Sequence, residues 1–313
     1  VAFLTGHGER SIDGIGERDY YAFSQYKDFR NSLVNQGFES ISLSLDSVNK
    51  VPENIDILVI SDVRTALSPK EQEIIENYIA EGRNLLIAGE PRRQEQMNPL
   101  LAPLGLSFMP GILVQESKDF STDLILANPT MASLNVINRF DKLLAFGNQI
   151  TMPSAVGIKQ TDEKGFKVVP ILTTDSTGSW NELETTDFID DTVCLNPAIG
   201  EVEKIYNTVV ALSRKVGNKE QKIILTGDAD CISNAELGVD REFRRSNYAL
   251  IDGMFRWLVY DEYPIDISRP AAKDNDVYLT PAGYAWVKIF LRWVCPAILV
   301  LLGCLIWFSR RMK

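Results

Sequence analysis

Six side chains that could bind a divalent cation stand where short apolar runs of the sequence end. They are His7, Glu9, Asp62, Glu90, Asp228 and Asp230. The runs before them, at residues 1–5, 55–60, 84–88 and 222–226, are typical of buried strands. Carboxylates together with a histidine suit a divalent metal or another cationic ligand. The alternative is that these are loop acids of an acid-rich chain, some of which cap helices. We therefore assign no cofactor.

Hydrolytic chemistry has little support in the sequence. His7 is the only histidine, so a Ser-His-Asp or Cys-His arrangement would have to use it. Cys231 follows a strand, but its neighbours Asp228 and Asp230 are negative, whereas a reactive thiolate needs a base or a positive charge nearby. The sequence contains neither a GxSxG elbow nor a GxxxxGK[ST] phosphate loop. An amidotransferase-like or metal-dependent hydrolase remains the alternative hypothesis, with His7, Glu9 and Asp228 as its residues.

Strands that alternate with helices must position these residues. After the run at 55–60, Ser68 suits a helix N-cap, Pro69 the first helical position and Glu71 the third position of a capping box. Gly82 ends that helix, and the next strand follows at 84–88. This alternation predicts an α/β fold with a parallel sheet and helices on both faces. Ligands of such a sheet bind beyond the carboxyl ends of its strands.

The remaining pattern completes one domain over residues 1–263. Helical spacing is expected at residues 20–36, 202–216 and 248–260. Residues 111–190 contain strand-like runs joined by polar turns, which predicts an inserted β-rich segment. Because the chain opens on Val1, we expect a mature form or a piece of a longer chain.

The charge of the chain is uneven. Five of its 32 basic residues lie after residue 284, so the rest carries 27 basic against 42 acidic residues, a net charge of −15. So acidic a surface repels phosphate backbones, which excludes nucleic acid as a partner. Cys194 and Cys231 could pair in an oxidising compartment, although two lone cysteines are more often free.

The C-terminal segment predicts a membrane-spanning helix over residues 286–309. Residues 289–308 are long enough to cross a bilayer core of about 30 Å. Trp293 and Trp307 suit interfacial aromatic belts, and Pro296 is tolerated because it lies near the start of the run. Arg310 and Arg311 open a basic tail over 310–313, which by the positive-inside rule predicts a cytoplasmic C-terminus. Residues 264–285 are then a tether, and the acidic domain lies outside the cytoplasm.

Taken together, these motifs resemble a known family. The segments that carry the resemblance are the TGHGE motif at 5–9, IDILVISD at 55–62, LSPKEQ at 67–72, YIAEGRNLLIAGEP at 78–91, VVPILTTDSTGSW at 168–180, IILTGDADCISN at 223–234 and NYALIDGMFRWL at 247–258. Their order, followed by one membrane helix with a basic end, resembles the GldG-type family, the auxiliary component of ABC-type transport systems linked to gliding motility. The resemblance covers essentially the whole chain.

The resemblance implies a Rossmann-like fold akin to the class I glutamine amidotransferases, without their nucleophile. It implies a non-catalytic component of the cytoplasmic (inner) membrane that binds a substrate or partner protein beside a permease. ATP hydrolysis would belong to a separate ATPase subunit, because this chain has no Walker motif. The lipid bilayer is the remaining expected partner, and homo-oligomerisation stays open. A purely structural scaffold is a third hypothesis.

Overall fold

The computed structural model describes residues 1–185, 187–188, 193–238, 244–262 and 281–312. The chain divides into two units, Val1–Ile265 and Asp266–Lys313.

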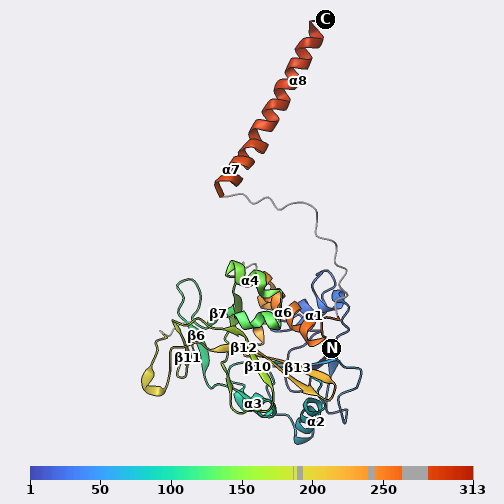
Figure 1. Cartoon of the computed structure of the whole chain (residues 1–313), viewed down its shortest axis with the longest axis vertical. Helices are drawn as coiled ribbons and strands as arrows, with labels where there is room; N and C mark the ends of the chain where they lie inside the picture. The colour runs from blue at the N-terminus through green and yellow to red at the C-terminus, as the bar shows by residue number, and fades with distance from the viewer. Residues whose placement is uncertain (186, 189–192, 239–243, 263–280, 313) are drawn as a thin grey trace. The chain divides into compact units, whose positions relative to one another are not determined.

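A parallel half-sheet forms one part of the first unit (Figure 1). Its strands stand in the order β2-β1-β3-β4-β13, and every neighbouring pair is parallel. Their bounds are β1 Ala2–Leu4, β2 Ile41–Leu43, β3 Ile57–Ser61, β4 Asn84–Ala88 and β13 Lys219–Thr226. In register, Leu85 of β4 lies between Leu58 of β3 and Ile223 of β13. The four strands expected at residues 1–5, 55–60, 84–88 and 222–226 are therefore present and adjacent.

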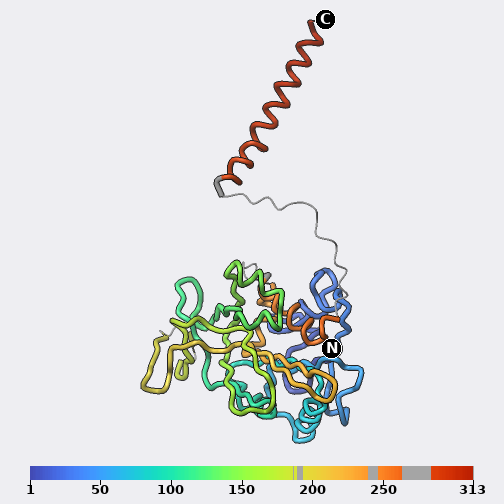
Figure 2. Tube along the Cα trace, in the orientation of Figure 1, coloured from blue at the N-terminus to red at the C-terminus, as the bar shows by residue number. Residues whose placement is uncertain are grey.

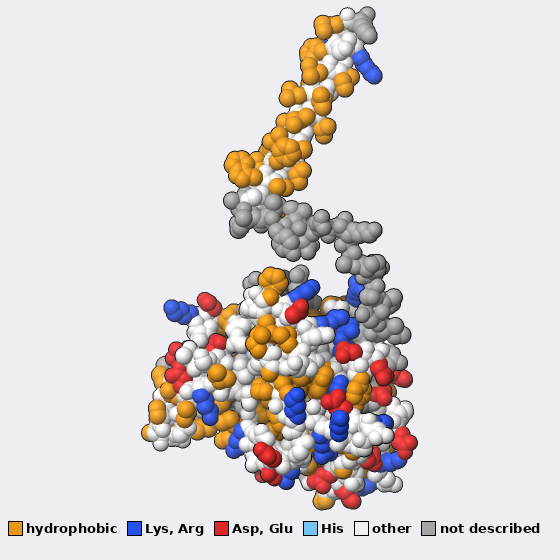
Figure 3. All heavy atoms as spheres, in the orientation of Figure 1, with side chains coloured by type: hydrophobic (Ala, Val, Ile, Leu, Met, Phe, Trp, Pro, Cys, Tyr) orange, Lys and Arg blue, Asp and Glu red, His pale blue; other side chains and the backbone are white. Residues whose placement is uncertain are grey.

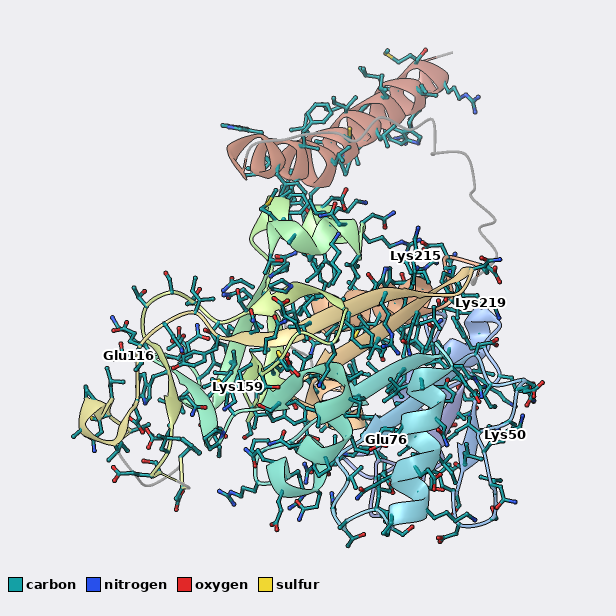
Figure 4. The ribbon with its side chains drawn as sticks, turned by 60° about the horizontal axis from the view of Figure 1, so that its bottom comes forward. Lys50, Glu76, Glu116, Lys159, Lys215 and Lys219 are labelled. Atoms are coloured by element: carbon teal, nitrogen blue, oxygen red, sulfur yellow. The ribbon has the colours of Figure 1, made fainter. Side chains whose placement is uncertain are left out.

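The sheet continues beyond β13 in antiparallel order, and the strands β10, β7 and β8 of this part come from the expected β-rich segment at 111–190. The further strands in the order β13-β12-β10-β7-β8 are β12 Asn207–Val216, β10 Lys167–Thr173, β7 Leu124–Pro129 and β8 Ile150–Pro153. Two short strands pair off this path, β9 Ile158–Gln160 and β5 Leu106–Phe108, and β6 Ile112–Gln115 forms a separate ribbon with β11 Ser179–Glu182. The fold is therefore α/β, with one large sheet that contains both parallel and antiparallel strand pairs. Figure 2 shows the β12–β13 hairpin beside the N-terminal strands, and Figure 4 shows Lys215 and Lys219 at its turn.

Helices cover both faces of the sheet. On one face lie α2 Pro69–Ala80 and α3 Gln94–Leu101, and on the other lie α1 Tyr21–Ser24, α4 Phe140–Phe146, α5 Asn234–Gly238 and α6 Arg244–Leu258. Short 3₁₀ helices are η1 Leu33–Gln36, η2 Ala102–Leu104, η3 Met131–Asn135, η4 Pro197–Ile199 and η5 Asp230–Ile232. Side chains of a strand alternate between two cores: Phe3 belongs to the core that α1 and α6 line, whereas Leu4 belongs to the core that α2 and α3 line. Glu76 stands on the outer side of α2 (Figure 4).

Two of the expected helices are wrong. Residues 207–216 of the helix expected at 202–216 form β12, which pairs with β13 on one edge and with β10 on the other. The helix expected at 20–36 is broken into α1 and η1. From η1, the side-chain amide of Asn35 donates to two carbonyls of the connecting segment, those of Lys27 and Phe29, both at 2.7 Å. In a continuous helix these carbonyls would accept hydrogen bonds from backbone N–H groups, so the amide of Asn35 competes with the helix for them.

The capping box of α2 is confirmed. The hydroxyl of Ser68 accepts from the backbone N–H of Glu71, and the Glu71 carboxylate accepts from the backbone N–H of Ser68 at 2.8 Å. Pro69 occupies the first turn, where its missing N–H costs no hydrogen bond.

We expect Ser68→Ala to lower the free energy of unfolding by about 1 kcal/mol, because the backbone N–H of Glu71 loses its side-chain acceptor and the Glu71 carboxylate loses the hydroxyl that donates to it. Urea unfolding followed by circular dichroism measures this change. Lys70→Ala, at an exposed position of the same turn, is the matched control and should change stability by less than about 0.5 kcal/mol. Equal losses for the two variants would contradict the capping role.

The second unit contains a continuous helical segment made of α7 Pro281–Ile289, a π-helical turn at Phe290–Val294 and α8 Cys295–Arg311. Residues Gly283–Arg311 are long and apolar enough to cross a membrane, and none of that apolar stretch is buried. Figure 3 shows hydrophobic side chains along it. Residues 281–285 of the expected tether belong to α7, and 264–280 lie outside the described residues.

Pro296 is the second residue of α8, as its place near the start of the apolar run predicts, although α7 and the π turn continue the helix before it. Proline has no N–H to donate to the carbonyl four residues earlier, here that of Arg292, and its ring crowds that carbonyl. The π turn immediately before α8 accommodates this missing bond.

Candidate functional site

Four of the six predicted site residues lie together at the carboxyl edge of the parallel strands. Asp62 follows β3, Glu90 follows β4, and Asp228 and Asp230 follow β13. Carboxylate oxygens of Glu90, Asp228 and Asp230 lie within 4.8 Å of one another. The strands are adjacent and parallel, so their loops emerge at the same edge.

Two arginines of the loop after β1, neither of them a predicted site residue, close a ring with Glu90 and Asp230. The Nη2 atom of Arg10 lies 2.7 Å from Glu90 Oε1 and 2.8 Å from Asp230 Oδ1. Arg18 approaches from the other side, with Nη2 3.1 Å from Glu90 Oε2 and Nε 3.2 Å from Asp230 Oδ2. Each carboxylate oxygen of the two acids thus faces a guanidinium group. We call these four residues the arginine–carboxylate ring.

Asp62 joins the ring to two further arginines. Its side chain is fully buried, and its Oδ2 lies 3.2 Å from Arg10 Nε and 3.1 Å from Arg64 Nη2. Its Oδ1 lies 3.2 Å from Arg93 Nε. Asp62 has a left-handed backbone, φ 49°, which a non-glycine residue adopts only at some cost.

The Gly-rich loop that carries Arg18 is positioned by one carboxylate and one amide. Asp19 accepts from the backbone N–H groups of Ser11 and Gly16, at 3.3 and 3.0 Å. A Cβ atom at Gly14 would lie 2.1 Å from the Asp19 carboxylate, so any other residue there would have to displace that carboxylate. The side-chain amide of Asn234 donates to the carbonyl of Gly16 at 2.8 Å. These bonds tie the loop to the start of α5.

Burial controls the protonation of the buried acids. It raises the pKa of Glu90 to about 7, and the negative charge of Asp230 adds to the shift, while Arg10 and Arg18 oppose it. Burial likewise raises the pKa of Asp228 well above its ordinary value, with Glu90 and Asp230 adding to it. Asp228 is fully buried, and its Oδ2 has no hydrogen-bond partner among the described residues.

Cys231 is poorly suited to act as a nucleophile. Its thiol is fully buried, and burial raises its pKa well above the ordinary value, with Asp228 adding to the shift. The Sγ atom lies 3.2 Å from the carbonyl of Asp228, so the thiol donates there. Cys194 is exposed, and both cysteines are free.

His7 and Glu9, in the loop after β1, form a separate group with Glu71 of α2. The imidazole Nδ1 lies 3.6 Å from Glu9 Oε1, and Nε2 lies 3.3 Å from Glu71 Oε2. The backbone N–H of His7 also donates to Glu9 at 2.6 Å. Thus these two predicted site residues connect the loop after β1 to the capping box of Ser68 and Glu71.

A cleft of about 610 Å³ opens beside the ring. One wall comes from the sheet edge, with Arg18, Asp62, Glu90, Pro91, Arg92, Arg93 and Asp230, and the other from the β-rich segment, with Ile112, Ser121, Asp123, Ser154, Asp187 and Phe188. A cleft of about 760 Å³ lies at the opposite edge, where β4 and β13 begin. We favour the smaller cleft as the site because ligands of parallel sheets bind beyond the strand carboxyl ends.

Glu90, Asp228 and Asp230 are close enough to share a cation, but guanidinium groups of the chain already contact the oxygens of Glu90 and Asp230. Sequence reasoning missed Arg10 and Arg18, although a signal was present. The segment Gly-x-Gly-Glu-Arg occurs twice in this loop, at residues 6–10 and 14–18, and ends each time on a ring arginine. The sequence does not show that both arginines face acids more than 70 residues away.

Comparison with known proteins adds a family and a fold. A family model described as an ABC-type uncharacterized transport system matches residues 1–255. No curated protein matches the chain. The solved structure titled "mmIFT52 N-terminal domain" is similar with a TM-score of 0.56 and 14% sequence identity, over 89% of this chain and 100% of that chain. At that identity the likeness concerns the fold alone.

Proposed function

The chain belongs to the family of ABC-type uncharacterized transport system auxiliary proteins, and on that basis we propose that it is a non-catalytic, membrane-anchored accessory component of such a system. It binds a substrate or partner in the cleft beside the arginine–carboxylate ring and associates with a permease through its C-terminal helix. The observation that carries the proposal is the combination, in one chain, of the family's α/β domain and a helix able to span a bilayer. We further propose that the parallel half-sheet is Rossmann-like, of the class I glutamine amidotransferase type.

The helix supports the anchoring part of the proposal. Its 29 residues, Gly283–Arg311, extend about 44 Å, more than the roughly 30 Å of a bilayer core. Arg292 and Arg310 are 18 residues apart, about 27 Å along the axis, so each lies near one headgroup layer. Arg310 and Arg311 support the proposal of a cytoplasmic C-terminus in the inner membrane and, with it, of an acidic domain outside the cytoplasm.

Two observations support a non-catalytic role. The oxygens of Glu90 and Asp230 face Arg10 and Arg18, which compete with any metal for them. The raised pKa of the Cys231 thiol disfavours the nucleophilic thiolate. ATP hydrolysis is accordingly assigned to a separate ATPase subunit.

Deletion of residues 281–313 tests the anchor. We expect the shortened chain to appear in the soluble fraction after membranes are washed in high salt and sedimented, whereas the full chain sediments with them. The loss of about 20 apolar residues removes the hydrophobic term that retains the chain in the bilayer. A shortened chain that still sediments after the wash would contradict anchoring by this helix.

Co-purification with the permease and ATPase subunits tests the association. The full chain should retain them in mild detergent. A matched variant, in which residues 283–309 are replaced by an unrelated apolar helix of equal length, should stay in the membrane but lose the permease. Retention of the permease by that variant would place the contact elsewhere.

A further inference from the structure

We propose that the carboxylates of Asp62, Glu90 and Asp230 form a guanidinium-binding site at the wall of the cleft, which Arg18 fills from within the chain and which an arginine side chain of a partner protein can take over. This proposal deepens the proposed function, because it gives the chemistry by which the cleft recognises a partner. Arg18 would then be an internal stand-in for that partner's arginine.

The two ring arginines differ in how readily they could leave. The Arg10 side chain is 1% exposed and bridges three carboxylates, whereas Arg18 is 46% exposed and is the ring arginine that lines the cleft. A half-exposed ion pair changes an equilibrium constant by less than about tenfold, because water already screens it. Hence the Arg18 side chain can leave its carboxylates at a small cost in free energy, while Arg10 stays buried against the same acids.

The charges of the cleft favour a cation in the place of Arg18. Its lining contains five acids, Asp62, Glu90, Asp123, Asp187 and Asp230, against three arginines, Arg18, Arg92 and Arg93. When Arg18 leaves, five acids face the two lining arginines and the buried Arg10, so the acids are still in excess. Asp228 brings a further carboxylate oxygen within 4.8 Å of Glu90 and Asp230, and its buried Oδ2 lacks a hydrogen-bond partner among the described residues.

The geometry selects a guanidinium group over a metal or an ammonium. Arg18 uses two different nitrogens, Nη2 toward Glu90 and Nε toward Asp230, at 3.1 and 3.2 Å. The planar fork of a guanidinium can serve both acids at once, whereas an ammonium is a single point of charge. A bare divalent ion carries twice the charge of a guanidinium, so the buried Arg10 repels it more strongly, whereas Arg18 shows that a guanidinium can lie beside Arg10.

The test uses the full chain in detergent and two blocked tripeptides, Gly-Arg-Gly and Gly-citrulline-Gly, with binding measured by calorimetry. Citrulline has nearly the shape of arginine but no charge. We expect Arg18→Ala to bind the arginine peptide several-fold more tightly than the unaltered chain, up to the roughly tenfold that the half-exposed ion pairs of Arg18 can contribute, and neither protein to bind the citrulline peptide. The double variant Arg18→Ala/Asp230→Asn should lose the gain, because one of the two facing carboxylates is gone.

Equal affinity of the arginine peptide for Arg18→Ala and the unaltered chain would overturn the proposal, as would an undiminished gain in the double variant. Methylammonium or Mg²⁺ binding to Arg18→Ala as tightly as methylguanidinium would overturn the choice of guanidinium. If Arg18→Ala does not fold, Arg18→Gln provides the same comparison with a polar side chain of similar length. Because peptide binding needs no permease, failure here and failure of co-purification are distinguishable.

Discussion

Replacing Arg10 by alanine should lower the free energy of unfolding by about 3–5 kcal/mol, the largest loss that we expect from a single substitution at this edge. Arg10 is among the largest fully buried side chains, and it faces Asp62, Glu90 and Asp230 at 2.7–3.2 Å. Without it, buried carboxylates lose the positive charge that compensates their removal from water. Chemical denaturation of the full chain in detergent, followed by tryptophan fluorescence, measures the change.

Arg64→Ala is the matched control. Arg64 also contacts Asp62, at 3.1 Å, but its side chain is 42% exposed, so its removal should cost less than about 1 kcal/mol. Arg10→Lys should recover only part of the loss, because one ammonium cannot face three carboxylates as a guanidinium does. A loss for Arg10→Ala no larger than that for Arg64→Ala would show that the ring contributes little to stability.

Stability should fall as the pH rises from 5 to 7, by on the order of 2 kcal/mol. Glu90 has a folded pKa of about 7 against an ordinary value of 4.5, so in this window the folded state binds more protons than the unfolded state. Its contribution to stability is present at low pH and is lost as the pH rises through 7. Burial raises the pKa of Asp228 too, which adds a slope of the same sign. Thermal unfolding in a series of buffers measures the slope.

The variant Glu90→Gln should flatten most of this slope, and Asp228→Asn should remove a further part. Glu71 and Glu182 are suitable references, because hydrogen bonds to their carboxylates lower their pKa values despite opposing desolvation. Their contribution is present above pH 4.5 and is lost only below it, outside the window in question. A slope between pH 5 and 7 that survives Glu90→Gln would assign it to other groups.

Short-range signals in the sequence predicted local structure well. The capping box of Ser68 and Glu71 could be predicted because both partners lie within one helical turn. The buried strands at 57–61 and 84–88 follow from continuous apolar runs. The prediction of a helix at 202–216 was wrong because the apolar spacing there fits both a helical and a strand period. Residues 207–216 form a strand because β10 and β13 pair with it on its two edges.

The candidate site was predictable only in part, for a related reason. Strand order alone places Asp62, Glu90 and Asp228 at one edge, because parallel strands share the direction in which they end. The role of Arg10 depends on acids that are 52, 80 and 220 residues away in the chain. No local pattern encodes such contacts, although a buried arginine always requires a partner.

The position of β13 between β4 and β12 has a consequence for biosynthesis. When residues 1–104 have emerged from the ribosome, β4 is paired on one edge only, and the residues that will cover its other edge, 219–226, have not been made. At about 5–20 residues per second, that edge stays open for some six seconds or more after β4 is complete. An apolar strand with an open edge invites pairing with other chains. This protein therefore has a window of aggregation during synthesis, which closes when the β12–β13 hairpin inserts and the ring can form.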